Sequence, residues 1–421
     1  MRQIRQSTKL QNVRYDVRGP ILVEAQRLEA EGHRILKLNI GNPAPFGFEA
    51  PDAILQDMIH NLPQAQGYSD SRGIYSARTA VASFYQSEGM RDVDVDDVYI
   101  GNGVSEMITM VLQALVDNGD EILVPAPDYP LWTGAVSLAG GTPVHYLCDE
   151  DNGWMPDLAD IEARITPATK ALVIINPNNP TGAVYSRETL AAVNALCRQR
   201  GLYHISDEAY EYFVFGGRLH FSPASLPDSQ EHTLSLFSFS KAYGMASWRV
   251  GYLVAPAHLQ TALEKAQDTD LICPPVISQY AALGALEAGT DFWRPRVAAL
   301  AEVRALVLAE LGRLDSFCTV PEAHGAFYFW LKLATSLEPL ALVERLVREF
   351  GVAAIPGTTF GLAGACTLRI AYGALERETV AEGVGRLVRG LNQIVGQPRG
   401  DRRTQPFGAQ PPGGAAGAPD P

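Results

Sequence analysis

Several patterns that mark other classes of protein are missing from this sequence. The chain has few cysteines, which are odd in number, scattered and never in a C-x-x-C pair: Cys148, Cys197, Cys273, Cys318 and Cys366. This usage favours free thiols in a reducing compartment over a disulfide framework. The eight histidines include no H-E-x-x-H motif, so no metal site is indicated. No stretch approaches the roughly 18 consecutive apolar residues of a membrane span.

Positive charge is also scarce. The formal net charge of -13 disfavours nucleic acid and anionic membrane surfaces as partners, because both attract basic surfaces. The first residues, "MRQIRQSTKLQNVRYD", contain no apolar segment of the kind that a secretion signal needs. We therefore expect a cytoplasmic protein that binds neither a membrane nor nucleic acid.

The 421 residues are enough for more than one domain. Short apolar runs alternate with amphipathic helical stretches, and the runs are 98–100, 121–125, 171–175, 202–205, 234–237 and 250–255. Buried strands that alternate with helices predict an α/β fold with a mostly parallel sheet covered on both faces.

The flanking segments predict a second unit. A helix is expected from Pro20 to about Gly32, since proline suits a first helical turn. Beyond about residue 290, further helices and short strands predict a smaller α+β domain that includes the N-terminal arm. After Val395 the chain is rich in Pro, Gly and Ala, and we expect a disordered tail.

Polar segments follow the predicted strands, and they read "GNGVSE", "APDYP", "NPNNPTG", "SDEAY" and "SFSK". Ligands of open parallel sheets bind beyond the carboxyl ends of the strands, so these groups are expected in one cleft. Each segment also has an ordinary structural explanation. Asp207 could cap a helix, Tyr129 could belong to the core, and Arg249 could form an ion pair. Lys241 could extend its amine to solvent.

The order and spacing of these groups match one chemistry, that of pyridoxal phosphate. This cofactor needs a lysine for its Schiff base, an acid at the pyridine nitrogen, a phosphate cradle and a support for its ring. The chain has only six lysines against 28 arginines, yet Lys241 stands in the apolar and aromatic run "LFSFSKAYGMASWRVGY". The motifs "NPNNPTG", "DEAY" and "SFSKAYGMASWRVGY", in this order, resemble those of class I aminotransferases of the aspartate aminotransferase fold.

The resemblance covers roughly residues 10–395. It implies a fold-type I enzyme with a mostly parallel seven-stranded sheet flanked by helices, and a smaller α+β domain built from both chain ends. The expected organisation is an N-terminal arm with part of the small domain (1–48), a large cofactor-binding domain (49–288), a small C-terminal domain (289–395) and a disordered tail (396–421).

The resemblance also implies the cofactor contacts. Lys241 forms the internal aldimine and moves a proton between the substrate Cα and the cofactor. Asp207 pairs with the pyridinium nitrogen, whereas Asn179 and Tyr210 contact the ring oxygen O3′. The remaining cofactor contacts are the ring-stacking Tyr129 and the phosphate-binding residues Gly103, Val104, Ser105, Ser238 and Arg249.

Substrate contacts follow from the same resemblance. Arg369 in "TLRIAYG" matches the arginine that binds the α-carboxylate of the amino acid, and the backbone of Gly41 lies beside that carboxylate. Tyr68 matches a tyrosine that reaches the phosphate of the neighbouring subunit, which implies a homodimer. Tyr15 and Arg18 match arm residues near the substrate, and Arg18 could pair with the side-chain carboxylate of glutamate.

The two halves of the chain resemble aminotransferases of different amino-acid specificity. The first 190 residues resemble bacterial glutamate–pyruvate (alanine) aminotransferases, which implies alanine transaminase activity through a pyridoxal/pyridoxamine phosphate cycle. The second half departs from that group, with Gly244 where an arginine is expected and Ser247 where a glycine is expected. An aspartate, aromatic or secondary-metabolism aminotransferase therefore stays open.

Two other classes of function stay open as well. A β-lyase or a decarboxylase-like enzyme of this fold would share the cofactor residues, since the reaction depends on which Cα bond is aligned with the ring. A cofactor-binding regulator would need a DNA-binding module, for which residues 1–18 are too short.

Overall fold

The structure is a computed structural model of the chain, and it describes residues 6–13, 19–44, 48–87, 89–90, 93–373 and 376–396. Two predicted site residues, Tyr15 and Arg18, lie outside the described residues, as does the predicted tail from residue 397 onward. No helix within the described ranges is long and apolar enough to cross a membrane.

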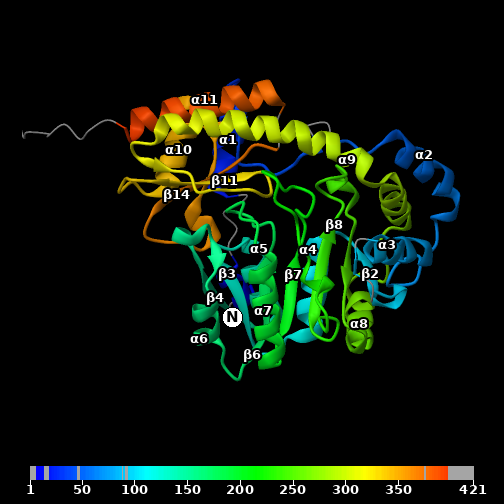
Figure 1. Cartoon of the computed structure of the whole chain (residues 1–421). Helices are drawn as coiled ribbons and strands as arrows, with labels where there is room; N and C mark the ends of the chain where they lie inside the picture. The colour runs from blue at the N-terminus through cyan, green and yellow to red at the C-terminus, as the bar shows by residue number, and fades with distance from the viewer. Residues whose placement is uncertain are drawn as a thin grey trace, which may run out of the picture.

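A large mixed sheet occupies the lower half of Figure 1, with the strand order β2-β9-β8-β7-β6-β3-β4-β5. Its strands are β2 (Val98–Gly101), β3 (Glu121–Ala126), β4 (Thr142–Asp149), β5 (Met155–Pro156), β6 (Thr169–Ile175), β7 (Tyr203–Asp207), β8 (Thr233–Ser238) and β9 (Gly251–Val254). The six strand segments predicted from apolar runs are confirmed. The sheet has eight strands instead of the seven expected, because the two-residue β5 pairs with the end of β4.

The strand directions bring the loops that carry the predicted site to one edge. Strands β4, β3, β6, β7 and β8 are parallel neighbours, whereas β9 is antiparallel to both β8 and β2. Strand β2 therefore runs in the same direction as β8. The carboxyl ends of β2, β3, β6, β7 and β8 share one edge of the sheet, where ligands of such folds bind.

Helices bury both faces of this sheet. The side chains of successive β3 residues point to opposite faces of the sheet. Ile122 and Val124 pack in the core on the side of α4, and Leu123 packs in the core on the side of α7. A strand with both faces covered is apolar throughout, which explains its continuous hydrophobic run. The helices of this part are α2 (Asp52–Asn61), α3 (Tyr75–Ser87), α4 (Val104–Leu115), α5 (Pro130–Ala139), α6 (Leu158–Arg164), α7 (Arg187–Arg200) and α8 (Gln260–Asp270).

The two ends of the chain meet in a second layer above the large sheet (Figure 1). An antiparallel sheet has the order β10-β11-β14-β13, and β1 pairs in parallel with β12. These strands are β1 (Leu36–Lys37), β10 (Cys318–Thr319), β11 (Tyr328–Leu333), β12 (Val352–Ala353), β13 (Ile355–Pro356) and β14 (Cys366–Ala371). Helices α1 (Pro20–Ala30), α10 (Pro339–Phe350) and α11 (Arg377–Ile394) accompany them. The predicted association of the N-terminal helix with the C-terminal third is confirmed.

Helix α9 (Val276–Leu311) connects the two layers, and α11 packs along it (Figure 1). The predicted domain boundary at 288/289 falls inside this helix, where Gly289 has non-helical dihedral angles (φ 61°, ψ -156°). Glycine alone adopts such a positive φ without strain, so it allows the change of direction. The domain limits at 48/49 and 288/289 stay predictions.

Two buried histidines lie near the far edge of the large sheet, away from the predicted site. The amide nitrogen of Asn194 lies 3.0 Å from Nδ1 of His204, and Nε2 of His232 lies 3.2 Å from the side-chain oxygen of Asn194. Because an amide N–H donates, His204 accepts at Nδ1 and is neutral. Burial, together with the nearby His232, lowers the pKa of His204 to about 3.

This histidine makes stability depend on pH. In the unfolded chain His204 takes up a proton near pH 6.5, and in the folded protein only near pH 3. The unfolded state therefore binds more protons in this window, and the free energy of unfolding should fall on acidification by about 1.4 kcal/mol per pH unit from this residue alone. Urea unfolding of the wild type, His204→Gln and the exposed-histidine control His60→Gln between pH 7 and pH 4 measures it. We expect a shallower pH dependence in His204→Gln only. Equal slopes in all three proteins would contradict the assignment.

Candidate active site

Lys241 lies in the turn after β8, and its amine points to a segment from the other layer. Nζ donates a hydrogen bond to the carbonyl oxygen of Gly41 at 2.8 Å, and it lies 5.8 Å from the centre of the Tyr210 ring. Burial lowers the pKa of Lys241 to about 8, with Arg369 and Arg249 adding to the shift. An appreciable fraction of the amine is thus neutral near physiological pH, as a nucleophilic or proton-transferring lysine requires.

Asp207 ends β7 on the same edge and is 4% exposed. Its carboxylate accepts hydrogen bonds from Trp132 Nε1 at 3.1 Å and from the backbone N–H of Ala209 at 3.3 Å. Burial raises the pKa of Asp207 to about 6 against the opposing effect of these two donors. A buried carboxylate at this pKa would be stabilised in its charged form by a cationic N–H, which a protonated pyridine ring offers.

Arg369, on β14, provides a buried positive charge. Its guanidinium group donates to the side-chain oxygen of Asn179 at 2.9 Å and to the carbonyl oxygen of Asn39 at 3.0 Å. Its Nε is buried and has no hydrogen-bond partner among the described residues. A desolvated cation held by neutral oxygens suits an anionic ligand, and a planar guanidinium matches a carboxylate in particular.

The start of α4 forms an anion cradle. Gly103 is the N-cap residue with φ 78°, and it offers no side chain to cap the helix. A Cβ at Gly103 would lie 2.8 Å from the guanidinium of Arg249, and one at Gly251 would lie 3.3 Å from the backbone nitrogen of Val104. The two glycines therefore keep space between a helix N-terminus and an arginine. The helix N-terminus and the arginine both favour a phosphate in this space.

The other predicted phosphate ligands lie on these same elements. Ser105 belongs to the first turn of α4 and is exposed. Ser238 ends β8, is 8% exposed and accepts a hydrogen bond from the backbone N–H of Ser240 at 3.1 Å. Arg249 donates to the carbonyl oxygens of Asn102 and Ala246, each at 2.9 Å, which fixes its guanidinium over the cradle.

The structure does not bring every predicted residue into this cluster. Tyr129, the N-cap residue of α5, is half-buried and close enough to Tyr210 to help raise the pKa of that tyrosine. Tyr68 is 84% exposed, so in a single chain it stands apart from the buried site residues. Tyr15 and Arg18 fall outside the described residues.

Three residues of the site were missed by sequence reasoning. Trp132 holds Asp207, and the carbonyl group of Asn39 accepts from Arg369. The hydroxyl of Tyr328 lies 2.7 Å from that of Tyr210. Trp132 and Tyr328 stand in apolar stretches and look like core residues, whereas a backbone carbonyl leaves no trace in the sequence.

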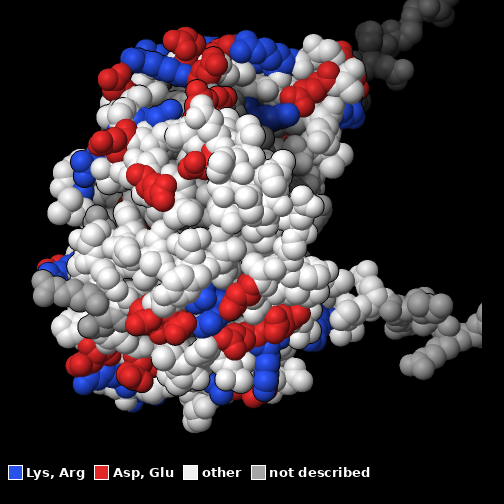
Figure 2. All heavy atoms as spheres, turned by 90° about the vertical axis from the view of Figure 1, so that its right-hand side faces the viewer, with Lys and Arg blue, Asp and Glu red and all other residues white. Residues whose placement is uncertain are grey.

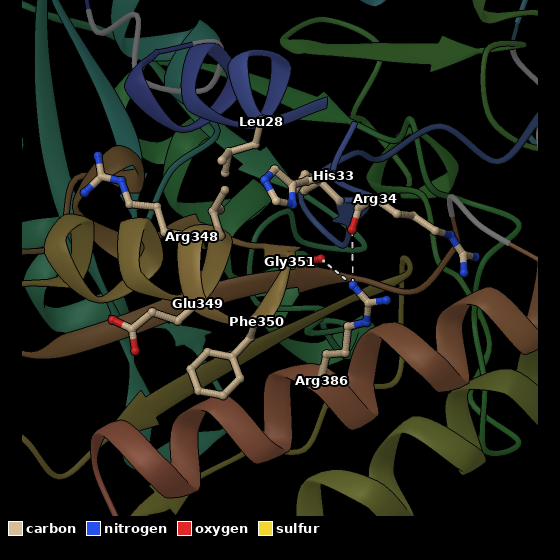
Figure 3. Close-up of a pocket in the computed structure, with 10 residues that line it drawn as sticks. Leu28, His33, Arg34, Arg348, Glu349, Phe350, Gly351 and Arg386 are labelled. Atoms are coloured by element: carbon tan, nitrogen blue, oxygen red, sulfur yellow. Dashed lines mark hydrogen bonds between the residues drawn. The ribbon is translucent and has the colours of Figure 1, made fainter. Parts of the chain in front are cut away.

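Another hollow, shown in Figure 3, lies between α1, α10 and α11 and has a volume of about 310 Å³. It contains several arginines, but they are already paired. Arg386 donates to the carbonyl oxygen of Arg34 at 3.1 Å and to Glu382 at 2.7 Å, and Arg348 donates to Glu24 at 2.6 Å. Closed ion pairs leave little charge for a ligand, so we do not regard this hollow as a second site.

Gly244, where an arginine was expected, is explained by its backbone. Its φ is 68°, and a Cβ at this position would overlap the carbonyl oxygen of Phe48. Both the dihedral angle and the close approach require glycine. The segment before the large sheet is therefore packed directly against the turn that carries Lys241.

The half-buried lysine, the carboxylate at the end of β7 and the anion cradle at α4 fit pyridoxal phosphate together. They define a pyridoxal-phosphate enzyme of the aspartate aminotransferase fold.

Comparison with known proteins agrees. Residues 33–387 match the family model for class I and II aminotransferases. The chain is 50% identical over 358 residues to an alanine aminotransferase from Mycobacterium tuberculosis, covering 83% of this chain and 82% of that protein. It is 52% identical over 304 residues to the glutamate–pyruvate aminotransferase AlaA from Escherichia coli, covering 70% and 75%. The crystal structure of an Escherichia coli aminotransferase has a TM-score of 0.86 at 41% identity and covers 94% of this chain and 100% of that one.

The chain belongs to the class I and II aminotransferase family. It is a pyridoxal-phosphate-dependent transaminase, as its sequence predicted.

The close contact at Gly244 can be tested by adding one methyl group. We expect Gly244→Ala to lower the free energy of unfolding by more than about 2 kcal/mol, because positive φ and a clash with backbone act together. Gly217→Ala is the matched control, since Gly217 has φ 74° with no atom within 4 Å of its Cβ position. It should lose only about 1 kcal/mol. Urea unfolding of both variants measures these losses. Equal losses of unfolding free energy in the two variants would contradict the steric explanation.

Proposed function

We propose that this aminotransferase acts mainly on the glutamate–pyruvate pair and thus serves as an alanine transaminase. The observation that supports this most is the 50% and 52% identity to an alanine aminotransferase and to a glutamate–pyruvate aminotransferase. These identities extend over most of both chains. Alignments that cover 83% and 70% of this chain extend beyond its first half, to which the resemblance to this group was confined.

The side chains support the amino-transfer step as follows. When bound, pyridoxal phosphate supplies an electron-withdrawing ring that stabilises negative charge at the substrate Cα. Lys241 holds the cofactor and then moves the proton at Cα, which its lowered pKa favours. Asp207 keeps the ring nitrogen protonated, and Arg369 binds the α-carboxylate and fixes the orientation of Cα.

The remaining proposed contacts complete the binding of cofactor and substrate. Asn179 and Tyr210 contact the ring oxygen and Tyr129 stacks on the ring, whereas Gly103, Val104, Ser105, Ser238 and Arg249 hold the phosphate. Gly41 presents its backbone to the substrate carboxylate. Tyr15 and Arg18 stay proposals for the substrate side chain, with Arg18 as the partner of the glutamate carboxylate.

We also propose a cytoplasmic homodimer in which Tyr68 completes the neighbouring site. Figure 2 shows a broad uncharged region between two charged bands on the face that carries α2. On and just after α2, Ile59 is 71% exposed and Leu62 is 56% exposed. Apolar exposure of this kind favours a protein partner. A second copy would bring the exposed Tyr68 to a site that its own chain does not reach.

Combining two impaired variants in one dimer tests whether Tyr68 serves the neighbouring site. Tyr68→Phe and Lys241→Ala should each be impaired alone. A dimer with one subunit of each has one site that combines an intact Lys241 with an intact Tyr68 from the partner. We therefore expect activity above both parents after co-expression and purification by two different tags. Activity per dimer equal to the mean of the two parents would show that Tyr68 serves its own chain.

A half-reaction tests the substrate pair. Cofactor-loaded protein is mixed with alanine, glutamate, aspartate or phenylalanine without any oxo acid, and the visible absorbance of the bound cofactor is followed. We expect stoichiometric bleaching that is at least tenfold faster with alanine and glutamate than with the other two, because of their differential transition-state binding. Lys241→Ala is the control and should show no covalently bound cofactor.

Other results of this half-reaction would indicate other functions. Faster bleaching by aspartate or phenylalanine would replace the glutamate–pyruvate pair with the aspartate or aromatic class. Release of ammonia and pyruvate from an amino acid with a leaving group at Cβ, such as cysteine, together with no bleaching by the four amino acids, would indicate a β-lyase.

A further inference from the structure

Tyr328 is the first residue of β11, is 2% exposed and contacts three residues of the proposed site. Its hydroxyl lies 2.7 Å from that of Tyr210. Its ring lies 4.3 Å from the guanidinium carbon of Arg369. The same hydroxyl occupies the place where a Cβ of Gly41 would be. A single side chain thus lies between the proposed ring-oxygen ligand, the proposed carboxylate ligand and the backbone that accepts from Lys241.

The environment of the two tyrosines sets the direction of their hydrogen bond. Burial raises the pKa of both hydroxyls, and the Arg369 cation opposes this rise at both. The Arg369 guanidinium lies 4.3 Å from the centre of the Tyr328 ring, whereas Lys241 Nζ lies 5.8 Å from the centre of the Tyr210 ring, so the nearer cation favours Tyr328 as the donor. When it donates to Tyr210, the proton of Tyr210 is left for another acceptor in the site.

We propose that Tyr328 is a positioning residue of the aminotransferase, with its hydroxyl directing the Tyr210 proton to the ring oxygen of bound pyridoxal phosphate and its ring supporting Arg369. This inference rests on the roles proposed above for Tyr210 and Arg369. Hydrogen bonds in a chain strengthen one another, so a Tyr210 that accepts from Tyr328 is a stronger donor.

The ring of Tyr328 has a separate effect on the carboxylate site. The guanidinium carbon of Arg369 lies over two aromatic rings, 4.3 Å from the centre of Tyr328 and 4.9 Å from the centre of Phe360. Aromatic faces attract a cation, and they hold the guanidinium plane in one orientation. The orientation of the guanidinium plane determines whether a carboxylate can bind to it with both oxygens. Removing the hydroxyl and removing the ring should therefore have different consequences.

Tyr328→Phe removes only the hydroxyl. In the cofactor-loaded protein, the visible absorbance would change with pH as the lysine–cofactor Schiff base loses the proton that it shares with the ring oxygen. A weaker donation from Tyr210 should raise the midpoint by about half a unit to one unit. The double variant Tyr210→Phe/Tyr328→Phe should have the midpoint of Tyr210→Phe alone, because Tyr328 acts through Tyr210. Tyr372→Phe, a buried tyrosine elsewhere in the same layer, is the control and should have the wild-type midpoint.

Tyr328→Leu removes the ring as well. The KM values of alanine and glutamate should both rise about tenfold over those of Tyr328→Phe, since the support of Arg369 is lost. An unchanged midpoint in Tyr328→Phe, or a further shift in the double variant beyond Tyr210→Phe, would overturn the positioning role of the hydroxyl. Equal KM values in the Phe and Leu variants would overturn the role of the ring.

The absorbance titration needs bound cofactor but no amino acid. A protein that shows the shifted midpoint and yet bleaches with neither alanine nor glutamate would refute the proposed substrate pair and still support Tyr328. The failure of one proposal is thus distinguishable from the failure of the other.

Discussion

The amine of Lys241 donates to the carbonyl oxygen of Gly41 in a place where burial and two guanidinium groups disfavour its charge. Asp207 opposes them. The balance lowers the pKa to about 8, far enough to leave part of the amine neutral at physiological pH. This balance depends on the positions of all the charged groups around the amine, since a displaced cation or carboxylate would change the reactivity of the lysine.

The fold fixes this balance by bringing together segments that are distant in the sequence. Lys241 and Asp207 follow neighbouring parallel strands, whose paired backbones determine their spacing. Gly41 and Arg369 come instead from the two chain ends, and Arg369 is held by Asn179, which follows β6 of the large sheet. The contact between Gly244 and Phe48 adds a further constraint, because it holds the lysine turn against the segment before α2. Positions in the two layers are therefore coupled through backbone and buried polar contacts.

The part of the fold that could be predicted is the part with a strong local signal. Buried strands such as β6 appear as uninterrupted apolar runs, and the polar residues after them stand out. Strand β4 was missed because it is half exposed at the side of the sheet, so its residues show no continuous run. Tyr328 and Trp132 were missed for a different reason. In a sequence, a buried aromatic residue that orients a neighbour looks the same as one that only fills the core. The close approach at Gly244 depends on residue Phe48, far away along the chain, and no local pattern reports it.

The electrostatics of the site also explain why it suits two anionic groups at once. Three cationic side chains lie at the site, Lys241, Arg249 and Arg369, and the carboxylate that acts on the Lys241 amine is that of Asp207. Burial makes such an excess of positive charge costly. A phosphate held by Arg249 and a carboxylate held by Arg369, as proposed above, would offset it, because each anion would neutralise one of the cations that repel the amine. Binding of cofactor and substrate would therefore raise the proton affinity of Lys241 at the moment when it has to accept the proton from Cα. The same arrangement that keeps the amine partly neutral in the free site thus prepares it to act as a base in the complex.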